Sequence, residues 1–172
     1  NGKTTLVAAL LAHGGRFYSD ELAVIRVDDL HVFPLPLPMS IKPGSVKPLE
    51  PYYPGLSRRH IHLRTDGKRV RYLSPSPHDL PSADSSSQVD YLIFPKYIEG
   101  AENRMLAIDK TDALRRLALT GSSNRVFSEQ DVEAMIALVE KRPCYEIIFS
   151  DLNQAVSQLK RHFFNCRYSI FL

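Results

Sequence analysis

The sequence predicts a single α/β domain, and three observations lead to this fold class. At 172 residues the chain has the usual length of one domain, with no internal repeat and no linker-like segment. Short apolar runs typical of strands, above all Tyr91–Pro95 and Cys144–Phe149, are interspersed with segments of helical periodicity. The chain also opens with a Gly-Lys-Thr motif that runs directly into an apolar, helix-forming segment. We therefore expect a mixed sheet with flanking helices.

The opening motif matches the second half of a Walker A sequence, G-x-x-x-x-G-K-[ST]. In that motif the glycines let backbone N–H groups surround phosphate oxygens, the lysine reaches the β- and γ-phosphates, and the hydroxyl group binds Mg²⁺. Gly2, Lys3 and Thr4 occupy its last three positions. The leading glycine and its strand would precede residue 1, so we interpret the chain as part of a longer protein, truncated at its N-terminus.

The residues after the motif favour phosphate binding over a chance match. Residues 4–12 contain no proline and are mostly good helix formers, and the stretch ends at Gly14-Gly15. A helix there directs its positive dipole end and its free N–H groups toward an anion. The alternative is a glycine-capped helix with a surface lysine. On the first interpretation the nucleotide-binding residues are Asn1, Gly2, Lys3, Thr4 and Thr5.

Composition and charge exclude several function classes. The formal net charge of +3 is mild, so we expect no nucleic-acid partner and interpret the basic clusters Arg58-Arg59 and Lys68–Arg71 as solvated surface rather than a polyanion site. Cys144 and Cys166 lie far apart without metal-ligand spacing, which favours small core residues in a reducing cytoplasm. No apolar run approaches the roughly 20 residues of a membrane helix.

The segment after the first helix carries the main acidic candidates. Arg16–Glu21 reads as a strand that ends in the acidic pair Asp20-Glu21. Because adjacent strand residues point to opposite sides, both acids can serve one site only if the strand has turned into a loop at Asp20. Residues 22–27 and 30–33 then predict a hairpin.

Two segments are expected to form flexible loops. Seven prolines between residues 34 and 54 forbid regular helix and most sheet, which leaves an extended loop. Within it, Lys42 and Ser45 either meet a phosphate or a substrate or serve a structural connection. Residues 74–88 are rich in Ser, Pro and Asp, which is typical of a mobile loop.

The remaining elements follow from local patterns. His60 and His62 share one face of a predicted strand, but a metal site there would need a third ligand. The other expected strands are a hairpin over 60–64 and 69–73, a buried central strand at 91–95, and strands at 105–108 and 144–149. Three further helices are expected: one over 110–120, one that begins at a capping box at Ser128 and ends before Pro143, and one that begins at Asp151.

Two classes of phosphate-loop protein fit poorly. An ATP-binding cassette needs a Leu-Ser-Gly-Gly-type signature and an apolar strand ending in Asp-Glu well downstream, and neither is present. A GTPase needs an Asn-Lys-x-Asp motif that binds the guanine base. Residues 109–112 read Asp-Lys-Thr-Asp, a near match that is better explained as acidic residues at the N-terminus of a helix.

A third class fits better, because the acidic pair follows the loop motif after only one helix and one strand. This order resembles the HPr kinase/phosphorylase family and its related serine kinases, which share a core with phosphoenolpyruvate carboxykinase. The second acid is Glu21 where the family usually has Asp, and the glycine-rich signature of the bifunctional enzymes is absent. The segments that carry the resemblance are Gly2–Thr4, Gly14-Gly15, Ser19–Glu21, 33–36, 40–42 and 145–151.

The resemblance implies a P-loop nucleotide-binding domain of the HPr kinase type that uses ATP and Mg²⁺ to phosphorylate a hydroxyl group of a peptide, protein or small molecule. Lys3 would hold the β- and γ-phosphates, and Thr4 would bind Mg²⁺. Asp20 would accept the proton of the acceptor hydroxyl, with Glu21 and Asp20 in the metal shell, and Lys42 would stabilise the transferred phosphoryl group. The alternative is a non-catalytic or merely hydrolytic nucleotide-binding module with a regulatory role. The sequence does not indicate an oligomeric state.

Overall fold

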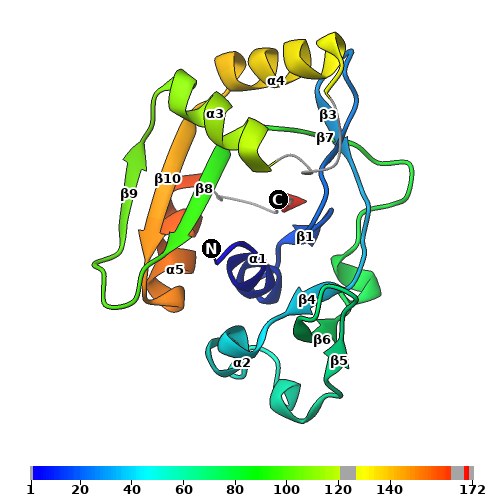
Figure 1. Cartoon of the computed structure of the whole chain (residues 1–172), viewed down its shortest axis with the longest axis vertical. Helices are drawn as coiled ribbons and strands as arrows, with labels where there is room; N and C mark the ends of the chain where they lie inside the picture. The colour runs from blue at the N-terminus through cyan, green and yellow to red at the C-terminus, as the bar shows by residue number, and fades with distance from the viewer. Residues whose placement is uncertain (1, 121–126, 164–168, 171–172) are drawn as a thin grey trace.

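The computed structural model describes residues 2–120, 127–163 and 169–170. Within these ranges the fold is mixed α/β, as predicted, with strands in four small sheets (Figure 1). In this part of the chain no helix has both the length and the apolar character that a membrane span requires. The helices are α1 (Lys3–Ala12), α2 (Pro43–Leu49), α3 (Lys110–Thr120), α4 (Glu129–Lys141) and α5 (Leu152–Phe163), with two 3-10 turns, η1 (Leu56–Arg58) and η2 (Pro77–Asp79).

The strands confirm the predicted hairpins but shorten several elements. β2 pairs with β3, and β5 pairs with β6, both antiparallel. The four sheets have the orders β1-β11, β8-β10-β9, β2-β3-β7 and β4-β6-β5. The strands are β1 (Arg16–Phe17), β2 (Val24–Ile25), β3 (His31–Phe33), β4 (Met39–Ile41), β5 (His62–Leu63), β6 (Arg69–Leu73), β7 (Ser87–Gln88), β8 (Leu92–Tyr97), β9 (Arg104–Ala107), β10 (Cys144–Phe149) and β11 (Ser169–Ile170).

The central strand of the sheet next to α5 is β10. It runs parallel to β8 and antiparallel to β9. The prediction of a buried central strand at 91–95 was therefore wrong, because β8 lies at the edge of this sheet in the described part of the chain and its side chains are only partly buried. Pro95 explains the edge position, since it has no backbone N–H to donate to a second neighbouring strand.

Helix α1 lies in the middle of the molecule, between the β8-β10-β9 sheet and the small sheet of β4, β6 and β5 (Figure 1). It contacts α2, α5 and β4. Every residue from Leu6 to Leu11 is buried, which is the pattern of a helix that is apolar around its whole circumference. The apolar segment after the Gly-Lys-Thr motif thus forms the core that fixes the position of the helix start.

The proline-rich segment contains regular structure, so the prediction that residues 34–54 exclude a helix was wrong. Its prolines are compatible with the short helix α2 because of where they fall. Pro43 occupies the first helical position, where a backbone N–H has no partner inside the helix. Pro48 lies one residue before the end, so few helical hydrogen bonds depend on it. Residues 74–88 likewise contain η2, closed by a capping box from Ser76, and β7.

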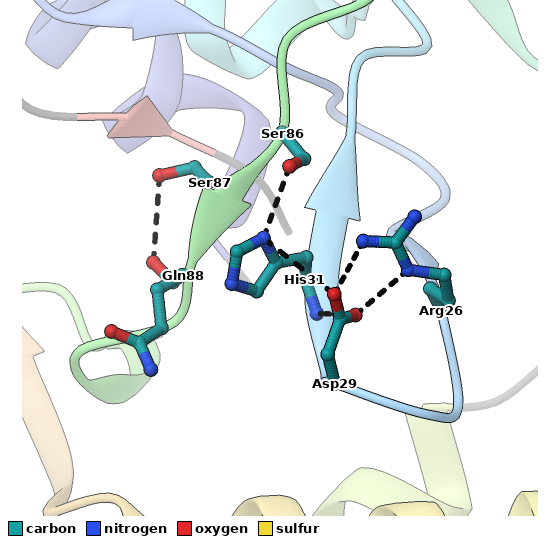
Figure 2. A network of polar contacts seen from close by, with 6 residues as sticks. All are labelled: Arg26, Asp29, His31, Ser86, Ser87 and Gln88. Carbon is teal, nitrogen blue, oxygen red and sulfur yellow. Dashed lines mark hydrogen bonds and ion pairs between the residues drawn. The ribbon is translucent and has the colours of Figure 1, made fainter.

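A polar network fixes the β2–β3 hairpin and ties β7 to it (Figure 2). The Arg26 guanidinium forms a two-point ion pair with Asp29, and Asp29 also accepts a hydrogen bond from the backbone N–H of His31 at 3.1 Å. The His31 ring nitrogen Nδ1 lies 3.0 Å from the Ser86 hydroxyl. The ion pair with Arg26 holds the pKa of Asp29 well below its usual range. The contacts among Arg26, Asp29 and His31 are local, and they account for the turn without reference to any ligand.

Candidate functional site

The amino end of α1 lies at the carboxyl ends of two parallel strands. Gly2 caps the helix with a φ of 95°, and a Cβ atom there would lie 2.9 Å from Cζ of Phe149 and 3.1 Å from Cβ of Tyr97. Both the backbone conformation and the close packing therefore require glycine. Tyr97 and Phe149 are the last residues of β8 and β10. In open α/β sheets this is the edge where ligands bind.

The first backbone N–H groups of α1 have no partner within the helix. The first helical hydrogen bond joins the Leu6 N–H to the Gly2 carbonyl oxygen at 3.0 Å, and no side chain caps the helix. The first turn contains no acidic residue, and Lys3 is exposed there. The arrangement concentrates positive charge at one end of a buried helix and is suited to an anion. Asn1, also predicted to contact the nucleotide, lies outside the described residues.

The chain bends at Asp20 and Glu21 instead of continuing as a strand. β1 ends at Phe17, four residues before the predicted end at Glu21. The Ser19 hydroxyl accepts a hydrogen bond from the Leu22 N–H at 3.2 Å, which fixes the bend. This is the change from strand to loop that both acids need in order to serve one site.

Asp20 is the most unusual polar residue in the described part of the chain. Its exposed fraction is only 7%, and neither carboxyl oxygen has a hydrogen-bond partner of standard geometry among the described residues. The pKa of Asp20 is raised from 3.8 to about 6, chiefly by burial and also by the nearby charge of Glu21. The Thr4 hydroxyl, which lies beside the carboxyl group, lowers this pKa, as do the charges of Lys3 and Lys42.

The electrostatic influence on Asp20 shows which predicted residues the fold brings together. Thr4 and Lys3 come from the start of α1, and Lys42 is the residue before α2. Asp20 comes from the bend after β1. Three predicted residues, Lys3, Thr4 and Lys42, drawn from 40 positions of sequence, thus act on one buried carboxyl group.

Glu21 and Thr5 lie at the same end of α1 but are engaged in other contacts. The Glu21 carboxylate accepts a hydrogen bond from Arg64 at 3.0 Å and is turned toward the β5–β6 hairpin. The Thr5 hydroxyl donates to the Ser45 hydroxyl at 2.6 Å, which ties α1 to α2. Of the two interpretations of Ser45, the structure therefore shows a structural connection.

Arg64 is a residue near the site that sequence reasoning did not select. Its guanidinium reaches both Glu21 and the Ser40 hydroxyl, the latter at 3.3 Å. Since Glu21 and Arg64 are 43 positions apart, no local sequence pattern predicts that they form a pair. It depends on the way in which the β5–β6 hairpin folds back on β4.

The residues around Asp20 fit a metal ion that is bound together with phosphates. No group of three His, Cys, Asp or Glu side chains able to hold a metal occurs in the described ranges, so a cage built from protein alone does not fit. Mg²⁺ usually binds through one or two carboxylates plus substrate phosphates and waters. Asp20, with two unpartnered oxygens next to the Thr4 hydroxyl, has the donor atoms for that arrangement. His60 and His62 instead contact each other through their rings.

The Asp-Lys-Thr-Asp segment is used for packing. Asp109 accepts a hydrogen bond from the Asp112 N–H at 2.8 Å at the start of α3. The Lys110 ammonium donates to the carbonyl oxygens of Val139 and Arg142, at 2.7 and 2.6 Å, and so joins α3 to the end of α4. These contacts support the interpretation as a helix N-terminus over a guanine-binding motif.

Comparisons of the chain with protein-family models, with curated proteins and with solved structures found no match. Function is therefore inferred from the opening motif and from the geometry at the amino end of α1.

Proposed function

We propose that the chain transfers a phosphoryl group from ATP to a hydroxyl acceptor at the amino end of α1. The observation that carries this proposal is the buried carboxyl group of Asp20, which lies beside Thr4 at an uncapped helix end and has no hydrogen-bond partner of standard geometry among the described residues. A buried polar group without a partner destabilises a fold, so its position beside an anion-binding helix end favours a functional role.

The same proposal extends to the fold. Gly2, Lys3 and Thr4 form the end of a P-loop, and the domain is a nucleotide-binding domain of the HPr kinase and phosphoenolpyruvate carboxykinase type. Support comes from the resemblance in sequence order and from the position of the helix start at the carboxyl ends of β8 and β10.

The triphosphate would bind to the free N–H groups of residues 3–5 and to the ammonium group of Lys3. Mg²⁺, held by Thr4 and by Asp20 or Glu21 together with the phosphates, would neutralise phosphate charge. Glu21 can join it only by giving up or sharing its contact with Arg64.

In the transfer step, the acceptor oxygen forms a bond to the γ-phosphorus, and the bond from that phosphorus to the bridging oxygen of ADP breaks. The proton of the acceptor hydroxyl passes to the Asp20 carboxylate. With a pKa of about 6, Asp20 is mostly ionised at neutral pH, yet it is basic enough to accept that proton. Lys42, whose charge acts on Asp20, would stabilise charge on the transferred group.

Incubation with γ-labelled ATP and Mg²⁺ tests the proposal. The acceptors would be a panel of serine-containing peptides, small proteins and small hydroxyl compounds. We expect label on at least one acceptor with the natural chain and none above background with Asp20→Asn. A non-catalytic or hydrolytic nucleotide-binding module would instead bind or hydrolyse ATP without labelling any acceptor, and Asp20→Asn would leave that behaviour unchanged.

A further inference from the structure

Positive charge is concentrated in one lobe of the molecule. Residues 42–73, called here the basic lobe, contain eight Lys and Arg residues and two acidic residues, a formal net charge of +6. The whole chain carries +3, so all other residues together carry −3. The lobe comprises α2, η1, β5 and β6 and stands at one end of the molecule (Figure 1). The basic clusters that look like scattered surface charge in the sequence therefore share one region of the fold.

The basic lobe contains an open groove with a volume of about 390 Å³ between α2, η1 and β6. Two of its lining residues, Pro43 and Val46, are apolar, and Lys47 and Arg71 carry positive charge. This combination of an apolar surface with a few charged groups is typical of ligand sites. The lining residues are Pro43, Val46, Lys47, Glu50, Ser57 and Arg71.

The one acidic group in the groove is already used by the fold. The Glu50 carboxylate accepts hydrogen bonds from the N–H groups of Gly55 and Ser57, at 2.9 and 2.8 Å, and from the Ser57 hydroxyl. These bonds lower the pKa of Glu50. Lys47 is exposed and has no ion-pair partner among the described residues. Glu50 stays ionised, but Lys47 and Arg71 outnumber it and Arg71 donates only to neutral carbonyl oxygens within the described ranges, so the net charge of the lining residues is positive.

The groove is fixed next to the proposed transfer site. Pro43, one of its lining residues, directly follows Lys42, whose charge acts on Asp20. Two hydrogen bonds hold the lobe to α1, from Thr5 to Ser45 at 2.6 Å and from the Tyr53 hydroxyl to the Ala8 carbonyl oxygen at 2.7 Å. A chain segment bound in the groove would thus lead toward Lys42 and Asp20.

We propose that this groove binds the acceptor of the reaction as an acidic polypeptide segment. Its carboxylates face Lys47 and Arg71, and an apolar side chain rests on Pro43 and Val46. Opposite charge on the two partners speeds association and excludes basic segments. The apolar surface favours a peptide over a nucleic-acid backbone. The identity of the segment as the acceptor rests on the proposed function, whereas binding itself does not.

Fluorescence anisotropy in the absence of ATP tests this proposal. The probe is a labelled peptide of about eight residues, roughly 28 Å when fully extended, with one serine and one leucine among Glu and Asp. Comparison probes are the same peptide with Lys at each acidic position and a single-stranded oligonucleotide of equal charge. We expect saturable binding of the acidic peptide only, weakening as salt is added.

Charge reversal provides the matched comparison. Lys47 and Lys141 both lie in the last turn of a helix, but only Lys47 lies in the basic lobe. Lys47→Glu should weaken binding of the acidic peptide by about tenfold at low salt, and Lys141→Glu by less than about twofold. Equal losses in the two variants, no binding to the natural chain, or tighter binding of the oligonucleotide would overturn the proposal. Peptide binding without any label transfer would overturn the kinase proposal and leave the groove in place.

Discussion

The amino ends of α1 and α4 are built in opposite ways. At α4, the Ser128 hydroxyl accepts a hydrogen bond from the Asp131 N–H at 3.2 Å, and the Asp131 carboxylate accepts one from the Ser128 N–H at 2.9 Å. At α1 the cap is Gly2, which has no side chain to offer, and Asp20 is buried without a hydrogen-bond partner of standard geometry in the described part of the chain. The α4 end is complete without a ligand. The α1 end retains N–H groups and a carboxyl group that are available to a ligand.

The acidic residues near helix starts show the same contrast. Asp112, in the first turn of α3, pairs with Arg115 and Arg116, and these contacts lower its pKa. Asp20 lies at a helix end without such partners, and burial raises its pKa to about 6. A paired acid supports the fold, whereas an unpaired buried acid weakens it. Departures of this kind from local consistency are concentrated at functional sites.

The largest expected effect is loss of phosphoryl transfer when the α1 end is changed. Lys3→Ala and Asp20→Asn should each lower the rate by about a hundredfold or more, as when one electrostatic contact to a transition state is removed. Initial rates of label transfer from ATP measure this. Ser128→Ala, the matched change at α4, should leave the rate within about twofold, since it affects only a helix cap. A fully active Asp20→Asn chain would refute Asp20 as the base.

The second effect is a pH-dependent gain in stability when Asp20 is neutralised. Because its pKa is raised from 3.8 to about 6 by folding, the folded chain binds this proton more tightly than the unfolded chain. The free energy of unfolding contributed by Asp20 therefore falls as pH rises from about 4 to about 6, by about 3 kcal/mol in total.

Asp20→Asn removes this cost, so the variant should be more stable than the natural chain at pH 8, and the difference should shrink as pH falls below about 6. Urea denaturation at several pH values measures it. Asp84→Asn, at an exposed loop position, is the control and should show no such trend. A stability difference for Asp20→Asn that stays constant between pH 4 and pH 8 would contradict the assignment of a raised pKa.

A third effect compares the two caps directly. Gly2→Ala introduces a Cβ atom 2.9 Å from Phe149 in a left-handed conformation, so it should lower stability by about 1–3 kcal/mol. Ser128→Ala should cost about 1 kcal/mol through loss of the capping box. Thermal unfolding measures both. If the two caps serve different purposes, ATP will raise the melting temperature of Ser128→Ala as it does for the natural chain, but not that of Gly2→Ala.

The smallest expected effect concerns the joint between α1 and the basic lobe. Thr5→Val and Ser45→Ala each remove the hydrogen bond between the two hydroxyl groups, and each should lower stability by about 1 kcal/mol. The double variant should cost less than the sum, since both changes remove one interaction. Additive losses in a double-mutant cycle would show that the hydroxyl groups do not act as a pair.

Local sequence patterns predicted the elements that local interactions decide. The apolar run after Lys3 predicted helix α1, and the Ser128 capping box predicted the start of α4. The patterns failed where tertiary position decides. Pro43 and Pro48 are compatible with a helix because of the positions at which they fall. Pro95 is compatible only with an edge position, and its strand β8 lies at the edge of the sheet in the described part of the chain.

The candidate site follows the same division. Lys3 and Thr4 were selected from the opening motif and Asp20 from the family resemblance, and the electrostatic influence of Lys3 and Thr4 on Asp20 indicates that the fold brings them together at one end of α1. The contact of Glu21 with Arg64 could not be predicted, because it joins segments 43 positions apart. The degree of burial of Asp20 could not be predicted from the sequence either, because it depends on the bend that Ser19 stabilises.

Titration of ATP and Mg²⁺ by isothermal calorimetry is the most direct measurement of whether the amino end of α1 binds nucleotide. We predict saturable binding to the natural chain, a loss of affinity of about tenfold or more for Lys3→Ala, and unchanged affinity for Lys141→Ala. Lys3 lies at the amino end of α1, whereas Lys141 lies in the last turn of α4. Affinity that survives Lys3→Ala unchanged, or a natural chain that takes up no nucleotide, would contradict a phosphate site at this helix.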